Sequence, residues 1–177
     1  MNMNDLERFC SLFDQQVRHT WATVSRLAPE KWANVSVETE ATHLGARVKR
    51  ITVEALVKHL CLAERAWLQT LPQALAGKEL SPPQGMDALD NVTGSLEILS
   101  FYRDSHAAGI EMARSYGRDV LEREITALGR RFTIQGFLWA VYGHHCYHFG
   151  HIDLLMRQQN VTPPDFIELP ETGEVIA

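Results

Sequence analysis

Four of the eight histidines of this chain lie within one stretch of eight residues: His144, His145, His148 and His151. The flanking residues repeat as they do on the apolar face of a helix. At about 100° per residue, His148 lies about 40° around the helix axis from His144 and one turn along it. Two imidazoles at this i,i+4 spacing can bind one metal ion.

The same helix offers a second, overlapping pair, His148 and His151 at i,i+3. His144 and His151 are separated by roughly 10 Å of helix rise, too far to share one ion easily. His145 points roughly 100° away from His144. The alternative interpretation is that these imidazoles are buried polar residues bonded to neighbours. Each buried nitrogen left without a partner would then cost on the order of 1–3 kcal/mol.

A third histidine borders the apolar face of another predicted helix. This helix begins after Thr52, a favourable N-cap, and runs to about Ala76, with His59 beside its apolar stripe. In a bundle, His59 can face His144 and His148, whereas a lone histidine at such a position is usually a satisfied core residue. Three neutral imidazoles with an open coordination position are typical of catalytic zinc, nickel or iron sites.

The chemistry of such a site depends on what occupies the open position. A divalent ion on three neutral ligands can lower the pKa of a bound water or thiol. HExxH is absent because His145 follows His144, so the glutamate base of a thermolysin-like protease is missing. GxGxxG, P-loop and GxSxG motifs are absent as well.

Helical periodicity accounts for most of the chain. Apolar residues recur every three or four positions in four segments, and we expect an all-α four-helix bundle. The intervening stretch Arg118–Phe132 is charged and predicts a strand or a loop, and His106 is expected to be structural or exposed. Trp67 and Trp139 are either core residues or the walls of a pocket beside the site. The predicted helices are Leu6–Leu27, Thr52–Ala76, Leu96–Tyr116 and Thr133–Gln159.

Length and composition predict a single domain over residues 1–177, with a core at about 5–160 and an irregular tail at 161–177. The net charge of -5 argues against a nucleic-acid partner. The chain contains neither a long apolar run nor a recognisable signal peptide, so we expect a cytoplasmic protein without membrane contact. The three cysteines, Cys10, Cys61 and Cys146, are expected to be reduced core residues.

Two segments resemble the DinB/YfiT-like superfamily of metal-dependent enzymes. Residues 51–60, which end in His59 and Leu60, are similar to its second-helix segment, and 144–152 to its H-x-x-x-H-x-G-Q-I motif. The resemblance implies that His59, His144 and His148 are the metal ligands. It also implies an up-down-down-up bundle with a long crossover at about Gly77–Asp90, and a homodimer. His151 replaces the glutamine common in that family, so it either hydrogen-bonds beside the ligands or is an alternative ligand.

The resemblance also frames the expected function. Some relatives transfer groups to low-molecular-weight thiols such as bacillithiol or mycothiol. We therefore expect a divalent metal, Zn, Ni or Fe, that activates either a water, as in a hydrolase, or such a thiol, as in a transferase, to act on a small-molecule substrate. The alternative is a non-catalytic bundle, with or without metal, in a damage-response or regulatory role.

Overall fold

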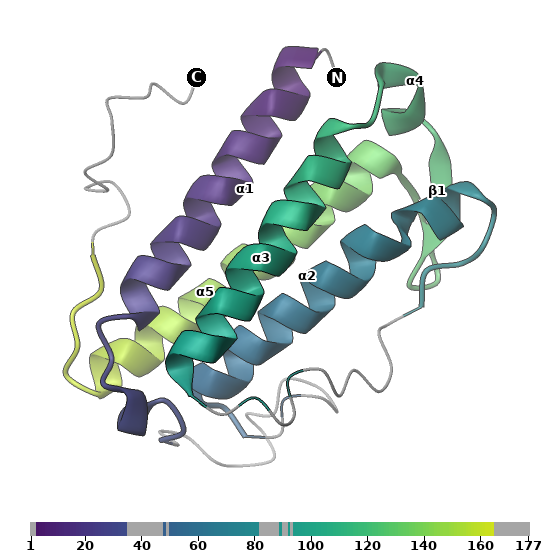
Figure 1. The fold of residues 1–177 in the computed structure, drawn as a ribbon. Coiled ribbons are helices and arrows are strands. Elements are labelled where there is room, and N and C mark those ends of the chain that lie inside the picture. The colour runs from purple at the N-terminus through teal and green to yellow at the C-terminus, as the bar shows by residue number, and fades with distance from the viewer. Residues whose placement is uncertain are drawn as a thin grey trace.

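In a computed structural model, four long helices form an elongated bundle (Figure 1). The structure describes residues 3–34, 48, 50–81, 89, 92 and 94–164. His43, most of the link before α2, most of the crossover before α3 and the last thirteen residues lie outside this part. The elements are α1 Met3–Val24, a short 3-10 helix Pro29–Lys31, α2 Val53–Leu75, α3 Ser95–Arg114, α4 Arg118–Leu121, β1 Glu124–Ala127, β2 Arg130–Thr133 and α5 Ile134–Gln158.

The direction of the helices confirms the predicted topology. The helices α2 and α3 run in the same direction, while α1 and α5 run in the opposite one (Figure 1). α3 packs between α1 and α2, and α5 packs against the same two helices. Because α2 and α3 are parallel, the chain must return along the bundle between them, which explains the long crossover.

The four predicted helices are confirmed to within a few residues at each end. Thr52 and Thr133 are N-caps, because their hydroxyl oxygens accept hydrogen bonds from the backbone N–H groups of Ala55 and Gly136. These caps satisfy otherwise unpaired donors in the first turns of α2 and α5. The core is filled by large apolar side chains from all four helices, among them Phe9, Phe13, Leu56, Leu60, Ile98, Phe137 and Leu138.

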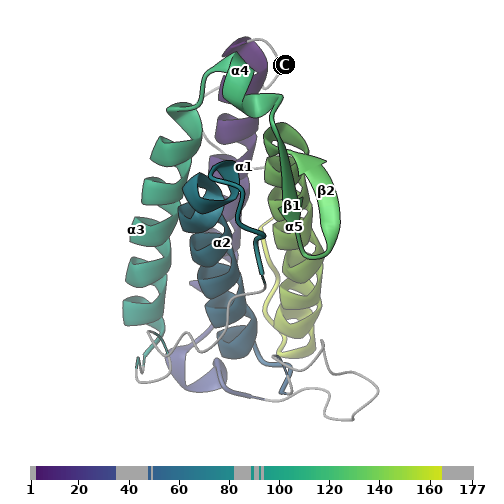
Figure 2. The same ribbon diagram turned by 90° about the vertical axis from the view of Figure 1, so that its right-hand side faces the viewer.

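The link before α5 contains the strand that the sequence pattern allowed, and also a short helix that it did not predict. A short helix, α4, and a two-stranded antiparallel hairpin occupy it, with Glu124 paired to Thr133 and Ala127 to Arg130. Leu128 and Gly129 both have positive φ, 53° and 73°, as a two-residue hairpin turn requires. The hairpin lies beside the first turns of α5 (Figure 2). Its strands are four residues long and rich in charge, so their weak alternation left both a strand and a loop open.

Candidate metal centre

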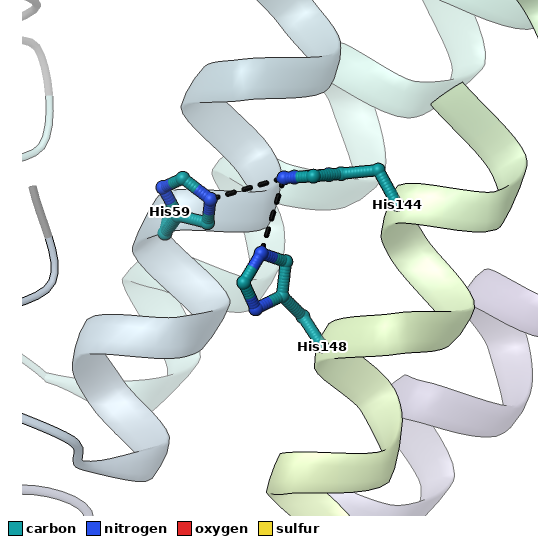
Figure 3. A group of neighbouring side chains, drawn as sticks. All are labelled: His59, His144 and His148. Atoms are coloured by element: carbon teal, nitrogen blue, oxygen red, sulfur yellow. Dashed lines mark hydrogen bonds between the residues drawn. The ribbon is translucent and has the colours of Figure 1, made fainter. Parts of the chain in front are cut away.

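Three histidines from two helices converge at one point (Figure 3). His59 extends from α2, and His144 and His148 extend from consecutive turns of α5. The Nε2 atom of His144 lies 3.1 Å from that of His59 and 3.1 Å from that of His148. One ring nitrogen from each residue lies within 4.8 Å of the other two, so the group could hold a metal ion.

The distances fit a metal centre better than a set of hydrogen bonds. In tetrahedral coordination with metal–nitrogen bonds of about 2.0–2.1 Å, ligand nitrogens are about 3.3 Å apart. The Nε2 of a neutral imidazole either donates one proton or accepts one hydrogen bond. His144 Nε2 therefore cannot form full hydrogen bonds with both neighbours at once. One cation between the three nitrogens would satisfy all of them.

The surroundings also keep His144 and His148 neutral, which is the form that binds metals. Burial lowers the pKa of His144 to about 4, and His59 and His145 lower it further as nearby groups of like charge. Burial likewise lowers the pKa of His148 to about 3, with contributions from His144, His59 and His151. At neutral pH, metal binding by His144 and His148 requires no prior loss of a proton.

His151 lies next to this cluster but outside it. Its ring centroid is 5.8 Å from that of His148, one turn earlier on α5, and 4.6 Å from the ring of Tyr147. The i,i+4 pair, His144 and His148, thus meets His59. The i,i+3 pair does not add His151 to this group. A supporting role beside the three candidate ligands remains the prediction for His151.

The two tryptophans proposed as pocket walls lie in different surroundings. The Trp67 ring meets the His144 ring edge-on, with centroids 4.8 Å apart, so it forms one side of the cluster. Trp139 packs against Phe9 of α1, with centroids 5.1 Å apart, and is 38% exposed. Of the two, Trp67 is the one placed to contact a molecule at the metal centre.

The remaining histidines include two that are buried in the bundle. His106 is 5% exposed and faces Asp14 across 3.4 Å, so the exposed alternative for it is wrong. Its neighbours in the sequence are polar, so its burial between α1 and α3 could not be predicted from the local pattern. His145 is completely buried and paired with Glu64. The sequence signal for that pair was Glu64 itself, an acid one turn after Leu60 on the apolar stripe of α2.

The cysteines are reduced, and two of them are core residues as predicted. Cys10 and Cys61 are buried, whereas Cys146 is half-buried on α5. Burial raises the pKa of Cys10 to about 11 and that of Cys61 to about 12, and it also raises the pKa of the Cys146 thiol. All three thiols are therefore protonated at neutral pH and are poor nucleophiles.

A comparison with family profiles matches residues 8–160 to the family described as mycothiol S-transferase. The chain belongs to the mycothiol S-transferase family. The matched segment contains His59, His144 and His148. A comparison with curated proteins gives no significant match.

Solved structures support the fold of this family member. A DinB-like protein, YjoA, from Bacillus subtilis superposes with a TM-score of 0.61 over 91% of this chain and 95% of that one, at 15% sequence identity. At this identity the likeness establishes the fold, and it confirms the DinB-like bundle expected from the histidine motifs. No helix in the described part of the chain is long and apolar enough to cross a membrane.

Proposed function

We propose that this protein is a metal-dependent S-transferase that joins a low-molecular-weight thiol, of the mycothiol type, to a small electrophilic substrate. In this proposal His59, His144 and His148 bind one divalent ion, Zn, Ni or Fe. The observation that carries it is the convergence of three ring nitrogens from α2 and α5. Membership of the mycothiol S-transferase family supports the thiol as the second component.

Each protein group has a distinct task in this proposal. The three imidazoles supply neutral ligands and leave the charge of the ion uncompensated. A bound divalent ion lowers the pKa of a thiol or water beside it. Trp67 covers one side of His144 and limits the approach of water there. The proposal takes the nucleophile from outside the chain, and it is consistent with the burial that raises the pKa of all three cysteine thiols.

A hydrolase would use the same three histidines with a water as the nucleophile. The family match favours a thiol, and it is the reason for preferring the transferase. The two reactions differ in a measurable way, because the transferase needs a thiol for turnover and the hydrolase does not. A non-catalytic metal-binding bundle would show neither activity.

The test combines metal analysis with a thiol-transfer assay. Purified protein is loaded with Zn²⁺, Ni²⁺ or Fe²⁺, and the bound metal is measured by elemental analysis. Mycothiol, bacillithiol and glutathione are then each offered with 1-chloro-2,4-dinitrobenzene. Transfer forms a C–S bond to the ring, releases chloride and leaves the thiol proton in solvent. We expect one metal per chain and turnover that requires both metal and thiol.

Two variants on α5 make the assignment specific. His148→Ala should lose the stoichiometric metal and the transfer activity, because two imidazoles remain. Leu154→Ala, a control at an exposed position further along α5, should keep the full metal equivalent. A full equivalent of metal in His148→Ala would refute the ligand assignment. Metal-dependent hydrolysis without turnover of a thiol would indicate a hydrolase instead of a transferase.

A further inference from the structure

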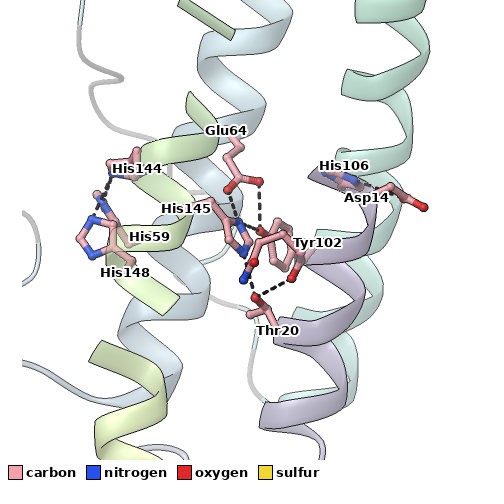
Figure 4. A network of polar contacts seen from close by, with 10 residues as sticks. Asp14, Thr20, His59, Glu64, Tyr102, His106, His144, His145 and His148 are labelled. Carbon is pink, nitrogen blue, oxygen red and sulfur yellow. Dashed lines mark hydrogen bonds and ion pairs between the residues drawn. The ribbon is translucent and has the colours of Figure 1, made fainter. Parts of the chain in front are cut away.

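A hydrogen-bonded network of four buried side chains crosses the bundle core (Figure 4). Nδ1 of His145 lies 2.6 Å from Oε1 of Glu64 and 2.8 Å from the hydroxyl of Tyr102. The Tyr102 hydroxyl donates to Oε2 of Glu64 at 3.0 Å. On the other side of the ring, Nε2 of His145 lies 2.8 Å from the hydroxyl oxygen of Thr20. A carboxylate can only accept, so His145 donates its Nδ1–H to Glu64.

Each of the four long helices contributes one member of this network: Thr20 from α1, Glu64 from α2, Tyr102 from α3 and His145 from α5. All four side chains are at most 3% exposed. Burying a carboxylate and an imidazole carries a desolvation penalty, and well-packed apolar side chains of similar volume are often as stabilising or more so. Stability alone is therefore a weak reason for this network. Its directional bonds instead specify how the four helices are arranged.

The network is joined through the backbone to the metal ligands. His145 directly follows His144 and comes three residues before His148, so the three rings move together if α5 rotates. Glu64 lies five residues after His59 on α2. A side-chain atom lies about 5–6 Å from its helix axis, so a rotation of about 10° moves it by on the order of 1 Å. Metal–ligand distances tolerate deviations of about 0.2 Å.

We propose that Glu64 and His145, supported by Tyr102 and Thr20, are positioning residues that set the rotation of α5 against α2 so that His144 and His148 meet His59. This inference rests on the proposed metal site and extends it to four side chains that do not touch the ion. Apolar packing alone would allow α5 small rotations, whereas the hydrogen bonds and close polar contacts of His145 with three other helices restrain it.

The decisive variant replaces the polar core by apolar groups of similar volume. In Glu64→Met/Tyr102→Phe/His145→Phe no polar network member is left unpaired, since the Thr20 hydroxyl can donate to the backbone oxygen of Gln16, 3.0 Å away. We expect a folded protein with cooperative thermal unfolding and a Kd for Co²⁺ raised about 10–100-fold. Its visible Co²⁺ absorption spectrum should also change, because that spectrum reports ligand geometry.

Two further variants separate positioning from a general effect on the fold. Glu64→Gln keeps an acceptor for His145 Nδ1–H and should retain a Kd for Co²⁺ close to that of the wild type. His106→Phe replaces another buried histidine, between α1 and α3 and away from the cluster (Figure 4), and should change neither the Kd nor the spectrum. Wild-type affinity and spectrum in the triple variant would overturn the proposal.

A metal-free measurement keeps this test separate from that of the proposed function. Long-range ¹H–¹⁵N spectra of the histidine rings report the surroundings of His59, His144 and His148 without any ion. We expect their ring signals to shift in the triple variant and to stay in place in Glu64→Gln and His106→Phe. If the wild type binds no Co²⁺, the proposed function fails, and unchanged ring signals in the triple variant would refute the positioning role independently.

Discussion

At the scale of single residues, His144 and His148 combine two properties that a metal ligand needs. Their rings point at a shared centre, and burial holds their pKa values at about 4 and about 3. His145, between them in sequence, faces the opposite way and bonds to Glu64 instead. Neighbouring histidines on one helix thus have different tasks because they lie on different faces.

The lowered pKa values predict an acid-sensitive metal-free protein. Both groups have an ordinary pKa of 6.5, so below that pH the unfolded chain binds protons that the folded chain does not. The free energy of unfolding should therefore fall as the pH decreases from about 6.5 through about 4 to about 3. Urea unfolding of metal-free protein at a series of pH values measures this free energy. His148→Gln should show a shallower decrease, and equal slopes would contradict the prediction.

Trp67 should report metal binding by its fluorescence. Its ring centroid lies 4.8 Å from that of His144, so Co²⁺ in the cluster would be close enough to quench its emission. We expect stepwise quenching that saturates at one equivalent of Co²⁺. In Trp67→Phe this Co²⁺-dependent quenching should disappear, while the three other tryptophans still emit. Undiminished quenching in Trp67→Phe would place the ion elsewhere.

At the scale of the elements, the site depends on two helices that both begin with a threonine N-cap. Thr52 and Thr133 cap α2 and α5, and these are the helices that carry His59 and the two histidines of α5. His59 lies in the second turn of α2, so the start of this helix determines where the ring lies. The histidines of α5 lie further from their N-cap, in the middle of that helix.

Removing either cap should destabilise the fold by a measurable amount. Thr52→Ala and Thr133→Ala should each lower the free energy of unfolding by about 1 kcal/mol, since one backbone N–H of the first turn loses its acceptor. Thr→Ser at the same positions should retain most of this free energy of unfolding. The two losses should add in the double variant because the residues are on different helices. Denaturant unfolding measures all of these, and an unchanged stability in Thr→Ala would refute the capping role.

At the scale of the whole molecule, the proposed metal centre links parts of the chain that are distant in sequence. His59 and His144 are 85 positions apart, and the proposed ligands belong to α2 and α5. An ion held by both helices therefore binds the folded bundle but has no such site in the unfolded chain. Binding must then stabilise the fold as a whole.

This linkage predicts a higher melting temperature in the presence of metal. At a free Zn²⁺ concentration about 100 times Kd, the folded state gains about 2.7 kcal/mol, which corresponds to a rise in Tm of roughly 5–10 °C for a domain of this size. His148→Ala should show almost none of this rise, whereas the exposed-site control Leu154→Ala should show all of it. Differential scanning fluorimetry with and without a chelator measures the shift. An equal shift in His148→Ala would indicate binding elsewhere.

Local periodicity was enough to predict the helices and the faces they bury. The spacing of apolar residues placed His144 and His148 on one side of α5 and His145 on another, because the angle per residue is constant along a helix. It also placed His59 at the edge of the buried face of α2. The family resemblance selected these three histidines from the pairings that the spacing left open.

The tertiary structure decided which faces meet. It placed Trp67 and not Trp139 beside His144, buried His106 against α1, and joined Glu64, Tyr102 and Thr20 around His145. It also revealed the hairpin before α5, whose short charged strands gain their stability from pairing with each other and with Leu80. Such contacts join residues far apart in sequence. They depend on how helices rotate and pack, which no local pattern encodes.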